Sequence, residues 1–186
     1  MNIEDLLKHP EKARTFLDKA IFGGNKKLAE ILIPIVKHPY STYLYAKEIV
    51  KGKIKDEWEY IIAQDPYASL DYAFNILKGP FPKGEDAIAR DSYTSYNYAV
   101  ILERPWPKGE DVIARDPRFA YYYARYVLKD RFPKGEKEII SSEITDPGND
   151  FGENGESGFS SYVKFLKSIN KLDEFLKDHP EVKDRV

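Results

Sequence analysis

The feature of this sequence that most constrains its fold is a stretch written almost identically twice. PFPKGEDAIARDSYTSYNYA (residues 80–99) is followed by PWPKGEDVIARDPRFAYYYA (residues 105–124). Alignment on the dipeptide Tyr-Ala extends the repeat to four copies, at spacings of 27, 26 and 25 residues. The four tyrosines are Tyr45, Tyr72, Tyr98 and Tyr123. A period of this length is typical of proteins assembled from tandem supersecondary units.

Each copy predicts a helix that begins at a capping residue. The residue seven positions before each tyrosine has a side chain that can accept hydrogen bonds from a first helical turn. Proline follows it in three copies and serine in one, and proline is well tolerated at a first helical position. The predicted capping residues are His38, Asp65, Asp91 and Asp116.

A second, shorter helix completes each unit. In PYASLDYAFNILKG the residues Leu70, Ala73 and Leu77 form one apolar stripe of the longer helix. A proline-rich connector follows, and then an acidic segment such as GEDAIARD, which is typical of a helix start. One such pair cannot bury its stripe, but stacked pairs can. The sequence therefore predicts an all-α fold, an α-solenoid of short helix-turn-helix repeats of about 25–27 residues.

The repeats define a predicted organisation for the whole chain. We expect a single helical-repeat domain over residues 1–186. Its parts are an N-terminal cap (1–34), regular repeats (35–140), an acidic, glycine-rich inserted loop (141–161) and a C-terminal capping helix (162–186).

One copy of the repeat is irregular. Eight residues separate the alanine from the large apolar connector residue in three copies, but only seven separate Ala99 from Trp106. We predict that this deletion falls in a turn.

Composition excludes several classes of protein. The 186 residues carry a net charge of −2, with 32% charged residues and no apolar run long enough for a membrane span. The N-terminus lacks the apolar stretch of a signal peptide, so we expect a cytoplasmic protein. The chain has no cysteine, which excludes disulfides and thiolate metal sites.

No residue pattern indicates catalysis, a cofactor or a metal. The three histidines, His9, His38 and His179, all precede proline, which favours capping or surface roles. The acids Glu59, Glu85, Glu110 and Glu136 recur from unit to unit, whereas a catalytic site is needed once. We interpret them as helix-start residues near the positive end of the helix dipole.

The tyrosines are the strongest candidates for binding. Thirteen of the fourteen lie between Tyr40 and Tyr126, and ten of these form three columns across the repeats. A short helix cannot bury three aromatic columns, so some rings should line an exposed face suited to protein contact. We predict binding through Tyr40, Tyr67, Tyr93 and Tyr122. Nucleic acid is disfavoured, because a glutamate lies two residues after each of Lys83, Lys108 and Lys134.

The stretch ITDPGNDFGENGESG (residues 144–158) interrupts the repeats and is a second candidate. We interpret it as a loop that contacts a partner, and the candidate residues are Asp146, Asp150, Phe151, Glu153 and Glu156. Calcium binding is an alternative. Its spacing departs from a calcium loop, because Phe151 stands where glycine is needed and Ser157 where the bidentate glutamate belongs.

The repeat pattern resembles that of a family of uncharacterised tandem-repeat proteins. At the level of DPxxAYxYAxxVLxxRFPxGE, here residues 116–136, the chain is similar to repeat proteins encoded by tailed bacteriophages and some large viruses. The similarity spans residues 35–136 and excludes 141–161. It implies an all-helical repeat and a viral origin, and it transfers no catalytic residue.

Together these patterns predict a protein that binds another protein and is not an enzyme. The resemblance implies a phage-encoded modulator or inhibitor of a host or bacterial defence protein. The alternative is a protein that binds RNA or a nucleotide messenger, with tyrosines stacked on bases and lysine or arginine on phosphate.

Overall fold

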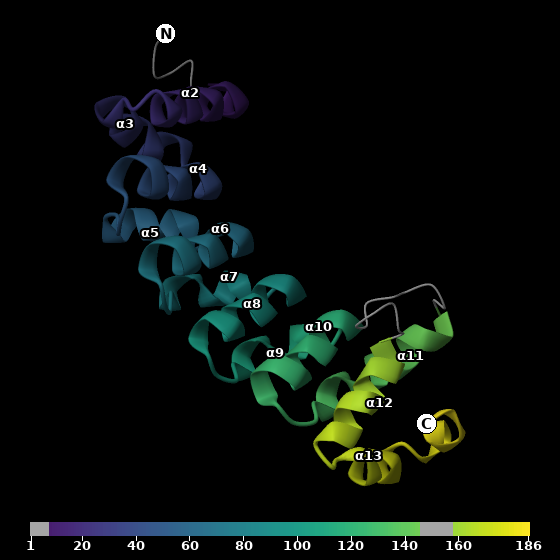
Figure 1. Cartoon of the computed structure of the whole chain (residues 1–186). Helices are drawn as coiled ribbons and strands as arrows, with labels where there is room; N and C mark the ends of the chain where they lie inside the picture. The colour runs from purple at the N-terminus through teal and green to yellow at the C-terminus, as the bar shows by residue number, and fades with distance from the viewer. Residues whose placement is uncertain (1–7, 146–157) are drawn as a thin grey trace. The chain divides into compact units, whose positions relative to one another are not determined.

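The structure, a computed structural model, describes residues 8–145 and 158–186, and every regular element in these two ranges is helical (Figure 1). The predicted all-α class is confirmed. We expected a single domain, but the packing separates the chain into two compact units, Met1–Ile88 and Ala89–Val186. We call them unit 1 and unit 2 and describe each by itself.

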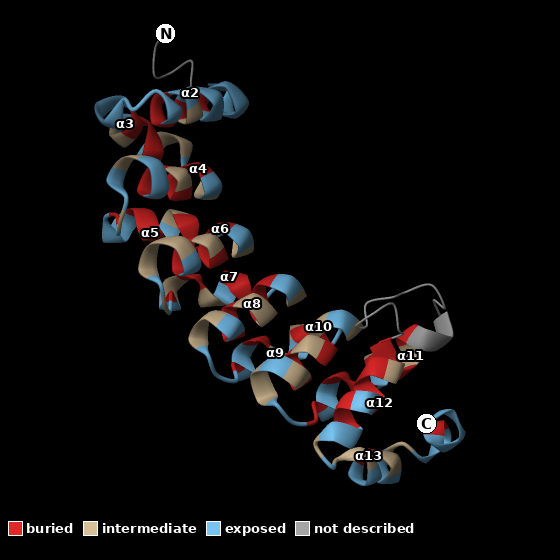
Figure 2. Ribbon diagram, in the orientation of Figure 1, coloured by how far each residue is buried: buried red, intermediate tan, exposed pale blue. Residues whose placement is uncertain are grey.

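Helix pairs build both units, with buried residues where neighbouring helices face one another (Figure 2). Unit 1 contains α2 (Pro10–Phe22), α3 (Lys26–Val36), α4 (Pro39–Leu44), η1 (Tyr45–Val50), α5 (Asp56–Ile62), α6 (Pro66–Asp71), η2 (Tyr72–Leu77), η3 (Pro82–Gly84) and α7 (Glu85–Ile88). Unit 2 contains α8 (Ser92–Leu102), α9 (Pro107–Ile113), α10 (Pro117–Tyr122), η4 (Tyr123–Leu128), α11 (Pro133–Thr145), α12 (Gly158–Ser168), α13 (Leu172–Asp178) and η6 (Pro180–Arg185).

The predicted helix caps are confirmed. At all four positions the side chain accepts a hydrogen bond from a backbone N–H of the first turn, and the positions are His38, Asp65, Asp91 and Asp116. The bond from Ala68 N–H to Asp65 Oδ1 measures 2.7 Å. These bonds satisfy donors that a helix start leaves unpaired.

A hydrogen bond between a buried tyrosine and a glutamate joins four of the helix pairs. In each of these four, the phenol donates to a glutamate of the helix that precedes it. The pairs are Tyr45 with Glu30, Tyr72 with Glu59, Tyr123 with Glu110 and Tyr162 with Glu136, at 2.8, 3.0, 3.2 and 2.7 Å. Glu59 and Glu136 are only 3% and 0% exposed. Our interpretation of these acids as helix-start residues therefore misses their main contact.

Three of these hydroxyls also bind the connector. The backbone N–H of the large apolar connector residue donates to the same tyrosine oxygen in the pairs Ile54 with Tyr72, Trp106 with Tyr123 and Phe132 with Tyr162, at 3.2, 2.8 and 3.3 Å. Burial raises the pKa of Tyr123 to about 12, although the Trp106 N–H bond lowers it, and the nearby Glu110 adds to the rise. The phenol therefore stays a neutral donor, and one oxygen joins helix, connector and neighbouring helix.

Lysines join successive pairs within a unit. In unit 1, Lys83 pairs with Asp56 and with Glu59, whose Oε2 lies 2.6 Å from Nζ. In unit 2, Lys134 lies 3.2 Å from Glu110 and 2.9 Å from Asp111. The acid that accepts from the tyrosine thus also receives a lysine from the next repeat. The sequence assigned to each lysine the glutamate two residues after it, but the acids that pair with Lys83 and Lys134 belong to the preceding repeat.

A π-helical turn recurs in the longer helices. The segments η1, η2 and η4 each begin at the tyrosine of Tyr-Ala, and each ends at a lysine in the left-handed conformation. In α8 this turn is missing, and the helix ends at Glu103, four residues after Ala99 instead of five. In all four copies the connector residue follows the left-handed residue by three. The one-residue deletion therefore lies in the helix, and our placement of it in a turn was wrong.

The end of the chain differs from the prediction. Residues 141–145 belong to α11 and 158–161 to α12, so the loop boundaries at 141 and 161 were wrong. The predicted single helix over 162–186 is divided into α12, α13 and η6, with Asn170 in the left-handed conformation at the break between α12 and α13. Tyr162 was missed as a member of the repeat because valine follows it, and because 26 residues separate it from Glu136 where 13 separate Tyr123 from Glu110.

A buried ion-pair network attaches α13 to α11. Arg131 and Glu136 are 6% and 0% exposed, and Arg131 Nη2 lies 2.7 Å from Glu136 Oε2. The same guanidinium reaches Glu174 at 3.2 Å and Asp178 at 2.8 Å, both on α13. Burial alone would raise the pKa of Glu136, but hydrogen bonds from Arg131, Tyr162 and His179 outweigh it and lower the pKa.

We predict that the glycine of the PKGE motif is needed for close helix approach. A Cβ on Gly109 would lie 2.5 Å from the Trp106 ring and 2.9 Å from Ser95 Cβ. Gly109→Ala should therefore lower the free energy of unfolding by about 1–3 kcal/mol in denaturant titration. Gly52→Ala is the matched control, since a Cβ there meets nothing within 4 Å. Equal losses in both variants would contradict the close-packing role.

We also predict an acid-dependent contribution from Glu136. Because its folded-state pKa is lowered, its stabilising effect is full above an unfolded pKa of about 4.3 and is lost as pH falls through the folded pKa. Glu136→Gln should cost about 3–5 kcal/mol at pH 7, since Arg131 stays buried without its main partner.

Denaturant titrations between pH 7 and pH 3 measure this effect. The difference between wild type and Glu136→Gln should shrink as the pH falls. Glu174→Gln is the control, because the Glu174 side chain is 57% exposed and its loss should cost under about 1 kcal/mol. Two parallel pH curves for wild type and Glu136→Gln would contradict the assignment.

Candidate functional site

The three tyrosine columns have different environments. The first column is exposed, with Tyr40, Tyr67 and Tyr93 at 42%, 50% and 45%, each the second residue of its helix. The Tyr-Ala column is fully buried and belongs to the core. The middle column is mixed, because Tyr43 and Tyr121 are buried and Tyr96 is partly exposed. The expectation that some rings lie at the surface is confirmed, while their role in binding stays a prediction.

The fourth predicted tyrosine, Tyr122, lies in a cluster of aromatic rings in unit 2. Ring centroids lie 5.8 Å apart for Tyr93 and Phe119, 5.8 Å for Tyr96 and Phe119, 6.0 Å for Tyr96 and Tyr122, and 6.1 Å for Tyr122 and Tyr126. These five residues come from α8, α10 and η4, and we call them the aromatic face. Tyr93 and Tyr126 are its most exposed members, at 45% and 49%.

Sequence analysis missed three residues of this face, namely Tyr96, Phe119 and Tyr126. Tyr96 and Tyr93 are three residues apart on α8, and Tyr122 and Tyr126 are four apart, so each pair lies on one side of its helix. That spacing could have indicated the cluster. Phe119 was overlooked because only tyrosines were compared between repeats.

Arginines cover the edges of the aromatic face. The Arg118 guanidinium lies 5.4 Å from the Phe119 ring centre, and Arg125 lies 5.5 Å from that of Tyr126. Arg125 also donates to the Tyr121 hydroxyl at 3.0 Å. Burial raises the pKa of Tyr96, and the neighbouring phenols of Tyr126 and Tyr122 add to the shift. The Tyr96 phenol is therefore a neutral group with a polar tip. Arg118 and Arg125 lie beside the rings, and Arg118 also pairs with Asp116 at 3.0 Å.

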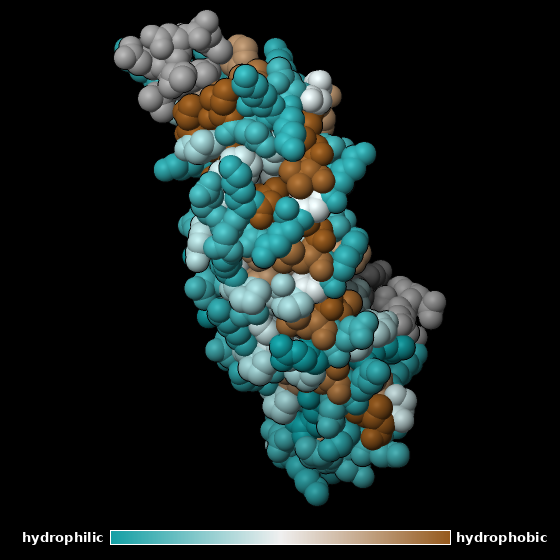
Figure 3. Space-filling view, turned by 90° about the vertical axis from the view of Figure 1, so that its left-hand side faces the viewer, coloured by the Kyte–Doolittle hydropathy of each residue, from teal (hydrophilic) through white to brown (hydrophobic). Residues whose placement is uncertain are grey.

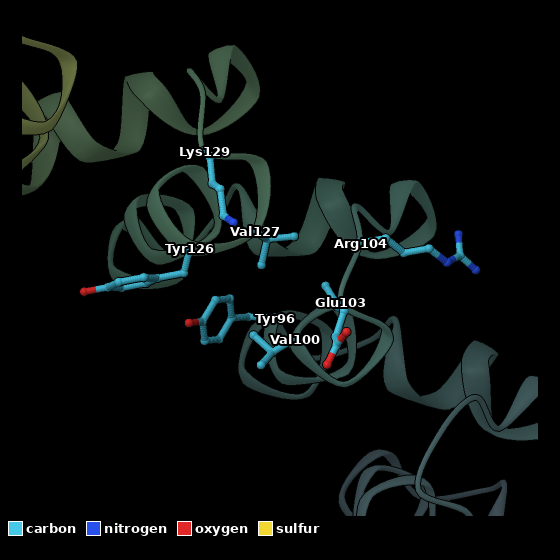
Figure 4. A pocket seen from close by; sticks show the side chains of 8 residues that line it. Tyr96, Val100, Glu103, Arg104, Tyr126, Val127 and Lys129 are labelled. Atoms are coloured by element: carbon cyan, nitrogen blue, oxygen red, sulfur yellow. The ribbon is translucent and has the colours of Figure 1, made fainter. Parts of the chain in front are cut away.

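A groove of about 760 Å³ adjoins the aromatic face. Its lining comes from α8 and η4 and from the residues that follow them: Tyr96, Ala99, Val100, Glu103, Arg104, Tyr126, Val127 and Lys129. Figure 4 shows Tyr96 and Tyr126 at one end, Val100 and Val127 in the middle, and Glu103 and Arg104 toward the other end, with Lys129 above Val127. The groove therefore changes from aromatic to aliphatic to charged along its length.

The charges of the groove are not neutralised by partners. Within the part of the chain that the structure describes, Glu103, Arg104 and Lys129 form no ion pair, and all three are exposed. Two cations and one carboxylate thus face solvent beside an apolar floor. An arrangement with few polar groups on an apolar surface is typical of a binding site.

Apolar surface also occurs in unit 1, where Phe22 is 69% and Ile31 47% exposed. Figure 3 shows hydrophobic surface at the N-terminal end of this unit. Separate exposed apolar side chains are common in proteins and indicate no site by themselves. The aromatic face differs because its rings contact one another and adjoin a groove.

The other predicted candidates fall elsewhere. Asp146, Asp150, Phe151, Glu153 and Glu156 lie outside the described residues, and so does the calcium alternative. In residues 8–145 and 158–186, no group of three or more His, Asp or Glu side chains is placed to hold a metal ion. His38 is a helix cap, and burial and then the charge of Arg14 lower its pKa. His9 and His179 precede helices without capping them by a side-chain bond.

Comparison with known proteins found no match: no family model, curated protein or solved structure matches this chain. Among the described helices, none has the length and apolar character required to cross a membrane.

Proposed function

We propose that the chain is a non-catalytic repeat protein that binds another protein through the aromatic face and groove of unit 2. The observation that carries this proposal is the cluster of five contacting rings, two of them about half exposed, beside an open groove. Aromatic side chains and arginine are enriched at protein interfaces, where a rigid ring contributes a large contact area at low entropic cost.

The nature of the nearby polar groups supports a protein partner. Phenol hydroxyls and arginine guanidinium groups at the edge of apolar surface can bind backbone carbonyls and carboxylates of a partner. The rest of each tyrosine ring remains available for apolar contact. Tyrosines and arginines of this kind are frequent energetic centres of interfaces.

A second candidate is a protein that binds RNA or a nucleotide messenger. The observation that favours it is the position of Arg104 and Lys129 in the same groove as Tyr96 and Tyr126, since bases stack on aromatic rings and cations bind phosphate. Glu103 in the same groove opposes it. Binding that weakens steeply with salt would distinguish this candidate.

The biological setting proposed here depends on the resemblance to phage-encoded repeat proteins. In that setting the partner is a host or bacterial defence protein, and the chain is a modulator or inhibitor of it. We expect the encounter to occur in the cytoplasm, because a chain without cysteine is suited to a reducing compartment.

We predict that a photo-crosslinking residue at Tyr126 captures a protein from lysate of the bacterial host, in a complex that resists nuclease. Tyr126 is 49% exposed and lies at the junction of the aromatic face and the groove. The matched control carries the same residue at Tyr60, which is 56% exposed and belongs to unit 1.

In the same lysate, the double substitution of Tyr93 and Tyr126 by alanine should reduce capture by an affinity tag about tenfold or more. The Tyr60→Ala variant should capture as wild type does. Identical crosslinks from positions 60 and 126, or undiminished capture by the double variant, would contradict the proposed face.

A further inference from the structure

The groove lies beside α8, which alone among the four described Tyr-Ala helices lacks the π-helical turn. Each copy with the turn has an alanine, then two residues, and then an isoleucine or valine. This isoleucine or valine lies two positions before the left-handed residue. These residue pairs are Lys47-Glu48, Phe74-Asn75 and Arg125-Tyr126. In α8 the single residue Val100 replaces the pair.

This replacement removes side-chain volume from the surface at one position. The first residue of each pair is long or aromatic, and Lys47 and Phe74 are exposed. In α8 no such side chain covers this part of the helix, and Val100, at 45% exposure, forms part of the groove lining. The groove lies between α8 and η4, where the copy without the π turn is next to a copy that has it, and we call it the recess.

The chemistry of the recess restricts what can occupy it. The middle is aliphatic with Lys129 above it, the Tyr96 and Tyr126 end is aromatic, and the far end has Glu103 and Arg104 (Figure 4). A nucleic acid backbone presents a row of phosphates, and Glu103 would repel them. A single carboxylate needs only one or two cations and is compatible with that glutamate.

We propose that this recess is a peptide-binding site whose occupant is a segment of the protein partner with a large apolar side chain and, a few residues along, an acidic side chain. The apolar side chain lies between Val100 and Val127, against Tyr96 and Tyr126. The carboxylate lies beyond the two valines, between Lys129 and Arg104. A volume of about 760 Å³ accommodates several side chains. This inference rests on the proposed function and names the chemistry of its partner.

The test uses the full chain and a displayed library of random octapeptides as the probe. Wild-type protein should enrich peptides with an aromatic or large aliphatic residue followed within about four positions by Asp or Glu. For the best enriched peptide, synthesised and labelled, the double variant R104E/K129E should show about tenfold or greater loss of affinity. The charge-reversed variant should itself enrich peptides with Lys or Arg in place of the acid.

Two further variants test the role of the deletion. Insertion of one alanine between Ala99 and Val100 restores the eight-residue spacing, and Val100→Phe fills the recess without changing the backbone length. Both should reduce peptide affinity about tenfold or more. The matched control is Val50→Phe, since Val50 is 37% exposed on η1 in unit 1 and should leave affinity unchanged. Circular dichroism spectra that match wild type would show that each variant is folded.

Several outcomes would overturn the inference. They are a wild-type library without enrichment, the same enriched motif in wild type and R104E/K129E, and full affinity in folded Val100→Phe. Labelled single-stranded RNA that binds wild type and is released by R104E/K129E would assign the recess to phosphate. The proposed function is tested separately, because crosslinking at Tyr126 together with any of these outcomes would retain the protein-binding face and reject only the peptide motif.

Discussion

The hydrogen bond between a buried tyrosine hydroxyl and a buried glutamate is the interaction on which the rest of this structure depends. A helix pair of this size has little apolar area of its own, and the hydroxyl fixes the pair by binding the acid of the preceding helix. In three pairs it also accepts the N–H of the connector residue. A carboxylate in the interior is costly without partners. Glu59, Glu110 and Glu136 each accept from a tyrosine, and Glu59 and Glu110 also pair with a lysine from the next repeat.

The contacts around this tyrosine–glutamate hydrogen bond explain why the motif PKGE recurs. The lysine pairs with the acids of the preceding repeat, the glycine allows close helix approach, and the glutamate receives the phenol. The same hydrogen bond also forms where more residues separate the glutamate from the tyrosine. Between Glu136 and Tyr162 the chain contains 13 residues more than between Glu110 and Tyr123, yet the bond is retained at 2.7 Å. The contact between the two residues is therefore kept although the segment between them is longer.

Much of the local structure was predictable because it depends on short-range chemistry. The capping aspartates and the following prolines determine where helices begin, and the period of the Tyr-Ala dipeptide identifies the repeat. The acids were misinterpreted because a glutamate at a helix start looks the same in sequence whether it faces water or a phenol from the next helix. The π turn was missed because no residue type marks it. Only the comparison of spacings, eight residues against seven at Ala99, contained that information.

The candidate site was predictable in part. Exposure of Tyr40, Tyr67 and Tyr93 follows from their place in the first helical turn, but the cluster with Phe119 and Tyr126 requires neighbouring helices in contact. The groove lies between side chains of two neighbouring helical segments, α8 and η4, and so no single residue type in the sequence indicates it.

A double-mutant cycle on one tyrosine–glutamate pair tests the central claim most directly. Denaturant titrations of Tyr72→Phe, Glu59→Gln and the combined variant yield the coupling free energy between the two side chains. Because Tyr72 and Glu59 are buried and their hydrogen bond involves a charged acceptor, we expect a coupling of about 1.5–3 kcal/mol. A coupling close to zero, with the two single losses simply additive, would show that the pair does not hold the helices together.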